Sequence, residues 1–238
     1  MYYLIADLKV WMSPQYKPLI DQIEPYKITY TPSSLDCQIP QNDEVIKRYQ
    51  EKNPHLTMGE AEYLLYGAYF YDSLLHHQGI FLHSSCVVYQ GYAYLFSANS
   101  GIGKSTHTSI WKKVFKDAFI LNDDKPALKF DDDILYAYGT PFSGKTNQNV
   151  NTKAKVAGIA FIYRSEINES KEMTSKETIV QFIAQTMKPH KEESFHLMAK
   201  TLDRIIKTTK FYSLGLNMND EAALMAYEVM SPNRKENI

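Results

Sequence analysis

The segment that decides the fold runs over residues 92–105 and reads Tyr92-Ala93-Tyr94-Leu95-Phe96-Ser97-Ala98-Asn99-Ser100-Gly101-Ile102-Gly103-Lys104-Ser105. Its first half is an alternating apolar run, which is typical of a strand. Its second half is a short glycine-containing turn, and the residues after it have helical character. A Gly-Lys-Ser sequence between a strand and a helix is typical of a phosphate-binding loop, because backbone N–H groups and the positive end of the helix face the anion.

This motif predicts an ATP site. Lys104 can reach the β- and γ-phosphates, and the Ser105 hydroxyl can coordinate Mg²⁺. The commonest form of the motif has a glycine at position 98, where this chain has Ala98. The alternative is a chance turn that opens an ordinary helix, and the preceding strand and following helix disfavour it. The residues expected to bind the nucleotide are Asn99, Ser100, Gly101, Ile102, Gly103, Lys104, Ser105 and Thr106.

A second motif follows, in which the apolar run 118–122 ends in the adjacent carboxylates of Asp123 and Asp124. Two acids at the end of a buried strand are costly unless a cation compensates them. A Mg²⁺ ion held between Ser105 and one carboxylate would do so, and the other carboxylate could accept a proton from an attacking hydroxyl. Taken alone, the pair favours the alternative, a surface turn that ends a strand, and the preceding phosphate loop is what favours the functional interpretation.

Three segments together resemble the catalytic core of HPr kinase/phosphorylase, whose fold is related to that of ATP-dependent phosphoenolpyruvate carboxykinase. They are His83-Ser84-Ser85-Cys86-Val87-Val88, the phosphate loop, and Leu121-Asn122-Asp123-Asp124. The resemblance implies that Asp123 is the catalytic acid/base, that Asp124 and Ser105 bind Mg²⁺, and that His83 lies beside them in the active site. The segment before residue 80 does not resemble the N-terminal domain of those enzymes, and no C-terminal signature for a protein substrate is evident.

Residues 139–147 form a small, polar segment that contains a single cation, Lys145. This segment is similar to one in shorter HPr-kinase-related proteins. Lys145 could supply positive charge to the transferring γ-phosphoryl group. The alternative is a surface loop with a solvated lysine.

The pattern of elements predicts an α/β fold in which the phosphate loop is set into a mixed, largely antiparallel sheet. Residues 1–78 are expected to form a strand and helix region packed on the core, beginning with one strand over Tyr2–Val10. Residues 79–238 are expected to form the HPr-kinase-like nucleotide-binding domain, with a strand over Phe81–Tyr89 and a helical C-terminal region. The predicted C-terminal helices are Thr174–Met187, Ser194–Lys207 and Asp220–Met230.

Composition excludes several classes of function. The formal net charge is −1, so no field favours nucleic acid or an anionic membrane. The two cysteines make no disulfide framework. The chain opens without a signal-type segment and has no apolar run of membrane-spanning length, so we expect a soluble cytoplasmic protein. A homo-oligomer is possible.

These features predict an ATP- and Mg²⁺-dependent kinase whose acceptor is a hydroxyl group. The hydroxyl could belong to a serine of a small protein or peptide, or to a small-molecule alcohol. One alternative is a nucleotide-gated binding module that hydrolyses ATP slowly and signals through a partner. Another is a phosphoenolpyruvate carboxykinase, although the chain is too short for the extra substrate domain of such enzymes.

Overall fold

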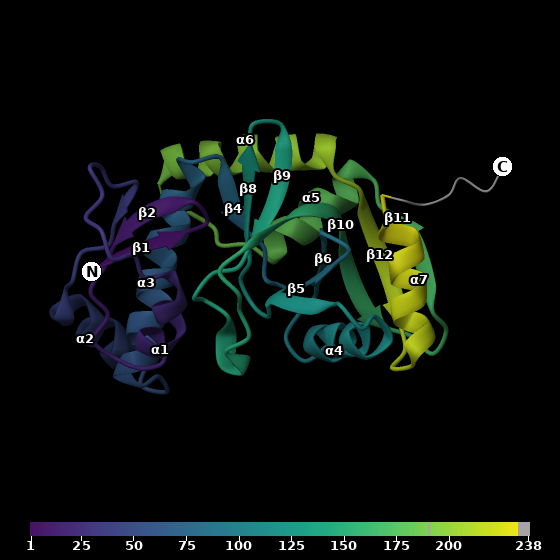
Figure 1. The fold of residues 1–238 in the computed structure, drawn as a ribbon, viewed down its shortest axis with the longest axis horizontal. Coiled ribbons are helices and arrows are strands. Elements are labelled where there is room, and N and C mark those ends of the chain that lie inside the picture. The colour runs from purple at the N-terminus through teal and green to yellow at the C-terminus, as the bar shows by residue number, and fades with distance from the viewer. Residues whose placement is uncertain (190, 233–238) are drawn as a thin grey trace.

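The computed structural model describes residues 1–189 and 191–232, which form a mixed α/β structure (Figure 1). Within these residues, seven α-helices accompany a three-stranded sheet and a nine-stranded sheet. The strands of the large sheet are β4 (Gly79–Phe81), β5 (Ser84–Tyr89), β6 (Tyr92–Ser97), β7 (Phe119–Asn122), β8 (Ala127–Asp131), β9 (Ile134–Tyr138), β10 (Lys153–Arg164), β11 (Glu169–Glu172) and β12 (Phe211–Leu216).

The large sheet is mixed, in agreement with the sequence pattern. Its main path runs β4-β8-β9-β10-β6-β5-β7, with β12 paired to β10 and β11 paired to β12. Strand β10 pairs in parallel with β6 and β12, and the other pairs in this sheet are antiparallel. The hairpins β5–β6 and β8–β9 account for the tight turns in the sequence.

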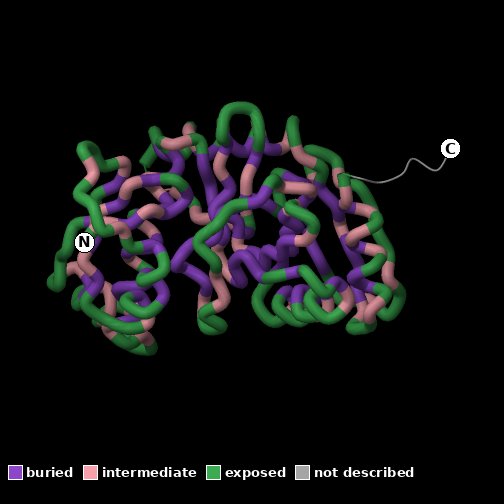
Figure 2. Tube along the Cα trace, viewed as in Figure 1, coloured by how far each residue is buried: buried purple, intermediate pink, exposed green. Residues whose placement is uncertain are grey.

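Both faces of the sheet are covered, so its strands bury alternate residues on opposite sides (Figure 2). In β10, for example, Ile159 and Phe161 belong to one core cluster, and Ala160 and Ile162 belong to another. The first cluster includes residues of α5 (Ser175–Ala184) and α6 (Glu192–Thr208), and the second includes residues of α4 (Lys104–Val114) and α7 (Asp220–Met230).

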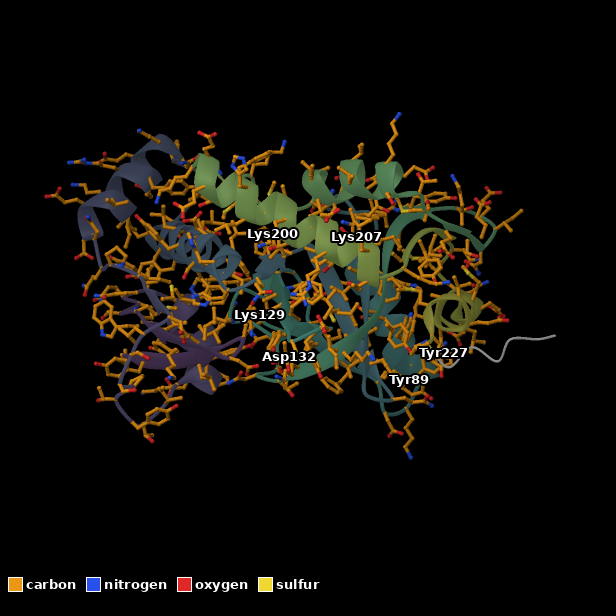
Figure 3. All side chains as sticks on the ribbon, turned by 90° about the horizontal axis from the view of Figure 1, so that it is seen from above. Tyr89, Lys129, Asp132, Lys200, Lys207 and Tyr227 are labelled. Carbon is orange, nitrogen blue, oxygen red and sulfur yellow. The ribbon has the colours of Figure 1, made fainter. Side chains whose placement is uncertain are left out.

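Local signals account for how these helices begin and pack. Thr174 and Glu177 form the capping box that starts α5, which satisfies backbone N–H groups of its first turn. Helix α7 packs through Tyr227, whose ring centroid lies 5.4 Å from that of Tyr89 in β5 (Figure 3). None of the helices in the described ranges is long and apolar enough to cross a membrane.

The N-terminal region packs beside the sheet, as Figure 1 shows in purple and blue. Its core is continuous with that of the rest of the chain, because Phe81, Ala127, Tyr138 and Phe142 belong to the same buried cluster. Its elements are β1 (Tyr2–Ile5), β2 (Leu8–Trp11), α1 (Leu19–Ile23), the 3₁₀ turn Glu24–Tyr26, β3 (Cys37–Gln38), α2 (Asp43–Lys52) and α3 (Met58–Leu75).

Two predicted strands are wrong as single elements. The run Tyr2–Val10 is the hairpin β1–β2, because Ala6 and Asp7 both adopt left-handed backbone angles, with φ of 53° and 63°. The run Phe81–Tyr89 is divided between β4 and β5. The N–H of His83 donates to the carbonyl of Gln185 rather than to a neighbouring strand, and β4 pairs with β8 instead.

Candidate active site

Sheet topology brings three of the sequence motifs to one edge. Strands β6 and β7 flank β5, and both run antiparallel to it. Their carboxyl ends therefore lie at the edge where β5 begins. The phosphate loop (residues 98–103) follows β6, the acid pair follows β7, and His83 precedes β5.

The phosphate loop turns through two glycines and opens a helix. Gly101 and Gly103 have φ of 82° and 125°, a region that other residues rarely adopt. Helix α4 begins at Lys104, so its first N–H groups face the loop. Arg164, at the end of β10, donates to the carbonyl oxygens of Gly101 at 2.7 Å and Ile102 at 3.1 Å, which ties the loop to the neighbouring strand.

Lys104 is a buried cation of the phosphate loop's helix. Its side chain folds back on the loop, where Nζ donates to the carbonyl of Ala98 at 2.9 Å. The residue is 8 % exposed, and its ammonium makes no ion pair within the described ranges. Burial lowers the pKa of Lys104, and the charges of Asp124 and Asp123 oppose that shift. A buried charge is normally paired, so this ammonium is suited to receive an anion.

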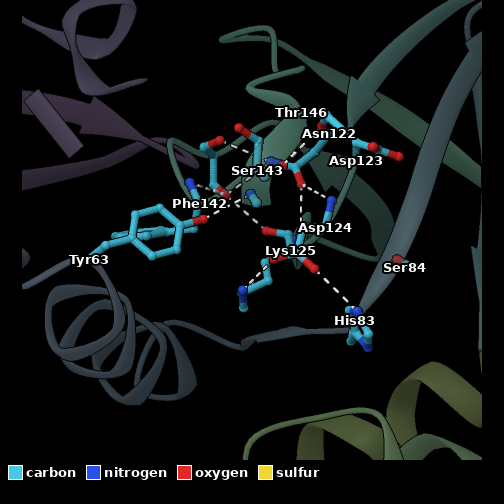
Figure 4. Close-up of polar contacts among 12 residues, drawn as sticks. Tyr63, His83, Ser84, Asn122, Asp123, Asp124, Lys125, Phe142, Ser143 and Thr146 are labelled. Atoms are coloured by element: carbon cyan, nitrogen blue, oxygen red, sulfur yellow. Dashed lines mark hydrogen bonds and ion pairs between the residues drawn. The ribbon is translucent and has the colours of Figure 1, made fainter. Parts of the chain in front are cut away.

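The two acids have different surroundings. Asp123 is 6 % exposed, and its Oδ1 accepts a hydrogen bond from the Ser85 hydroxyl at 2.5 Å. No cation within the described ranges pairs with it. Asp124 instead contacts Nε2 of His83 at 3.2 Å with one carboxylate oxygen and the ammonium of Lys125 with the other (Figure 4). Adjacent residues therefore present two different carboxylates: Asp123, bonded to a neutral hydroxyl, and Asp124, bonded to His83 and Lys125.

The turn after β7 explains why the carboxylates of Asp123 and Asp124 have different partners. Oδ1 of Asn122 accepts from the N–H groups of Asp124 at 3.0 Å and Lys125 at 2.7 Å, which forms a tight turn at the strand end. Burial by itself would raise the pKa of Asp124. Hydrogen bonds and charges from His83 and Lys125 outweigh burial and hold that pKa below its usual value.

His83 connects the acid pair to the phosphate loop. Its Nδ1 lies 3.0 Å from Oε1 of Gln185, and Nε2 of Gln185 donates to Oδ1 of Asn99 at 2.7 Å. Sequence reasoning missed Gln185, which follows α5 and lies far from the motifs in the chain. No pattern in the sequence marks it, because its role depends on where α5 packs.

Residues 139–147, which we call the Lys145 loop, bring Lys145 to the same site. It lies in a short 3₁₀ turn, Gly144–Thr146, and its side chain is exposed. The preceding Gly144 has φ of 70°, and a Cβ atom there would lie 3.0 Å from Cβ of Asp124. The loop therefore passes directly against the acid pair, and a larger residue at position 144 would be strained.

These residues line a cleft of about 440 Å³. Asn99 and Ile102 are expected nucleotide residues that do not line it, since Asn99 contacts Gln185 and Ile102 lines a neighbouring cavity. The described residues contain no cluster of three His, Cys, Asp or Glu side chains that could hold a metal. The cleft is lined by His83, Ser100, Gly101, Gly103, Lys104, Ser105, Thr106, Asp123, Asp124, Ser143, Gly144, Lys145, Thr146, Arg164 and Met218.

Comparison with known proteins adds little. No protein-family model and no curated protein matches the chain. Among solved structures, the chain is similar to the Hpr(Ser) kinase/phosphatase from Coxiella burnetii, with 12 % identity and a TM-score of 0.38. The match covers 63 % of this chain and 93 % of that one.

Proposed function

We propose that this protein is an ATP- and Mg²⁺-dependent kinase that transfers the γ-phosphoryl group to a hydroxyl. One observation carries the proposal: a buried cation, Lys104, and a buried carboxylate, Asp123, line the same cleft, and neither has an ion-pair partner among residues 1–189 and 191–232. Each charge is costly when buried alone. The phosphates of a bound nucleotide would supply an anion to Lys104, and the acceptor's hydroxyl would supply a proton to Asp123.

Different residues of the cleft carry out different parts of phosphoryl transfer. Lys104, the loop N–H groups and the start of α4 bind the phosphates. Asp123 accepts the proton of the attacking hydroxyl, and His83 orients Asp124. Lys145 adds positive charge where charge develops during transfer.

The donor set suits Mg²⁺, which is usually held by one or two carboxylates together with substrate phosphates. Ser105 and Asp124 would hold the ion, and it would neutralise phosphate charge. Asp124 is already bonded to His83 and Lys125, so this role requires Lys125 to release one carboxylate oxygen. The acceptor is a seryl side chain of a protein or peptide, or a small-molecule alcohol.

The test measures ADP formed from ATP and Mg²⁺ with a panel of serine-containing peptides and small alcohols, together with label transferred from γ-phosphate. We expect acceptor-dependent transfer that Asp123→Asn abolishes. ATP binding without transfer to any acceptor would instead support a nucleotide-gated binding module. Absence of ATP binding would contradict both functions.

A further inference from the structure

A second cavity, of about 260 Å³, opens beside the cleft at the far side of the phosphate loop. It shares Gly103, Thr106, Arg164 and Met218 with the cleft, so the two spaces are adjacent. Its wall is largely apolar and comes from α4 and from the ends of β10 and β12. The apolar side chains include Ile102, Ile110, Ile162, Leu216 and Met218.

The charged cleft and the adjacent apolar cavity correspond to the triphosphate and the base of a nucleotide. His83, Asp123, Asp124 and Lys145 line the cleft and not this cavity. A nucleoside triphosphate has a polyanion at one end and a flat, weakly polar ring at the other. Ligand sites of this kind combine apolar walls with a few placed polar groups.

We propose that this cavity, the base pocket, binds the adenine ring of ATP, so that the γ-phosphoryl group points towards Asp123 and Lys145. The inference rests on the proposed function, since it assumes that the phosphates occupy the cleft. It adds the direction in which the nucleotide lies and the residues that bind its base.

His107 supplies an independent observation. This residue lines the base pocket and is 4 % exposed, and its Nε2 accepts a hydrogen bond from the Trp111 indole N–H at 3.0 Å. Burial lowers the pKa of His107 to about 4, so the ring is neutral at pH 7 and its proton lies on Nδ1. That nitrogen is buried without a partner in the described part of the chain. Because Nδ1 is covered by protein atoms, the His107 ring would have to shift before this unsatisfied donor could bond an acceptor atom of a base or ribose.

The test compares ATP with inorganic tripolyphosphate, which has the phosphates but no base. In Ile110→Trp, the larger side chain fills the base pocket. By titration calorimetry with Mg²⁺, we expect ATP affinity to fall at least about tenfold, while tripolyphosphate affinity stays within about twofold of the parent. Val180→Trp, on the exposed surface of α5, is the matched control and should change neither affinity.

The outcomes separate this inference from the proposed function. Equal effects on ATP and tripolyphosphate, or no effect on ATP, would overturn the base pocket. If the parent binds neither ligand, the proposed function fails as well. Tyr163→Ala provides a second variant in case Ile110→Trp does not fold, because Tyr163 is an exposed wall residue. It should weaken ATP and not tripolyphosphate.

A different set of contacts carries a second inference, about the N-terminal region. The N–H of Gly144 donates to the hydroxyl of Tyr63 at 2.9 Å, and the carbonyl of Gly144 accepts from Nε2 of Gln22 at 3.1 Å. Tyr63 and Gln22 are buried and come from α3 and α1. We infer that they are positioning residues, which hold the Lys145 loop against Asp124. Through Lys145 this inference also rests on the proposed function.

Trypsin cleavage after Lys145 reports how firmly the loop is held. In Tyr63→Phe, which removes only the hydroxyl, we expect cleavage to accelerate several-fold. The kcat for ADP formation should fall, while the KM for ATP stays near the parent value. Tyr66→Phe is the matched control, because the Tyr66 hydroxyl lies on the same helix and donates to Ser13 instead.

Three results would overturn this second inference. They are unchanged cleavage in Tyr63→Phe, an equal change in Tyr66→Phe, and faster cleavage with an unaltered kcat. If the parent forms no ADP, the proposed function fails, while the cleavage rates still decide whether Tyr63 holds the loop.

Discussion

The phosphate loop and the Lys145 loop line the same cleft, but they are held in different ways. The phosphate loop takes its shape from its own glycines and from the strand and helix on either side of it. The Lys145 loop takes its place from Tyr63 and Gln22, which are distant in sequence. The shape of the first loop is therefore encoded locally, although Arg164 also ties it to β10, and the position of the second depends on the packing of the N-terminal region.

The largest expected effect concerns Asp123, which lines the same cleft as the two loops. Asp123→Asn keeps the shape of the side chain but removes its basicity, so turnover should fall by about a hundred- to ten-thousandfold. Nucleotide affinity should be largely retained. Single-turnover transfer from γ-labelled ATP measures the first quantity and calorimetry the second.

The companion variant Asp124→Asn distinguishes the roles within the pair. It should raise the Mg²⁺ concentration needed for half-maximal rate more than Asp123→Asn does. Should both variants transfer phosphate as fast as the parent, the catalytic role of the pair is wrong.

Lys104→Ala tests the locally encoded loop. At an ATP concentration a hundredfold above its dissociation constant, ligand binding should stabilise the parent by about 2.7 kcal/mol, and most of this gain should disappear in the variant. Thermal unfolding with and without ATP and Mg²⁺ measures the difference. Lys112→Ala, an exposed lysine on the same helix, is the control and should behave as the parent.

Lys145→Ala tests the other loop and should have a smaller effect. Lys145 is exposed, so its charge contributes less than that of a buried group, and we expect turnover to fall by about tenfold. The affinity for ATP should change little. A large loss of affinity with unchanged turnover would assign Lys145 to ground-state binding instead.

The smallest expected effect is on stability at acid pH. The folded-state pKa of Asp124 lies below its usual value of 3.8, so its ionised form stabilises the fold above about pH 4. This contribution disappears as the pH falls through the folded-state pKa. The difference in Tm between the parent and Asp124→Asn should therefore shrink as the pH falls below about 4.

An exposed acid provides the control for this measurement. Asp133 pairs with Arg204 on the surface, where ion pairs contribute little. Asp133→Asn should leave the Tm nearly unchanged at every pH. A gap for Asp124→Asn that persists undiminished at low pH would mean that the carboxylate charge does not stabilise the fold.

The sequence by itself determined the strand, loop and helix around Lys104, the strand that ends at the acid pair, and the helices of the C-terminal region. These follow from periodicity and from hydrogen bonds that close within a few residues, such as the capping box of Thr174 and Glu177. Only the tertiary structure decided that Gln185 joins His83 to Asn99 and that Arg164 ties down the phosphate loop. The sequence also did not predict that the run Tyr2–Val10 folds as a hairpin. Nor did it predict that the Lys145 loop is bound by Tyr63 and Gln22. The first depends on left-handed backbone angles at Ala6 and Asp7, which are not glycines, and the second on contacts between residues that only packing brings together.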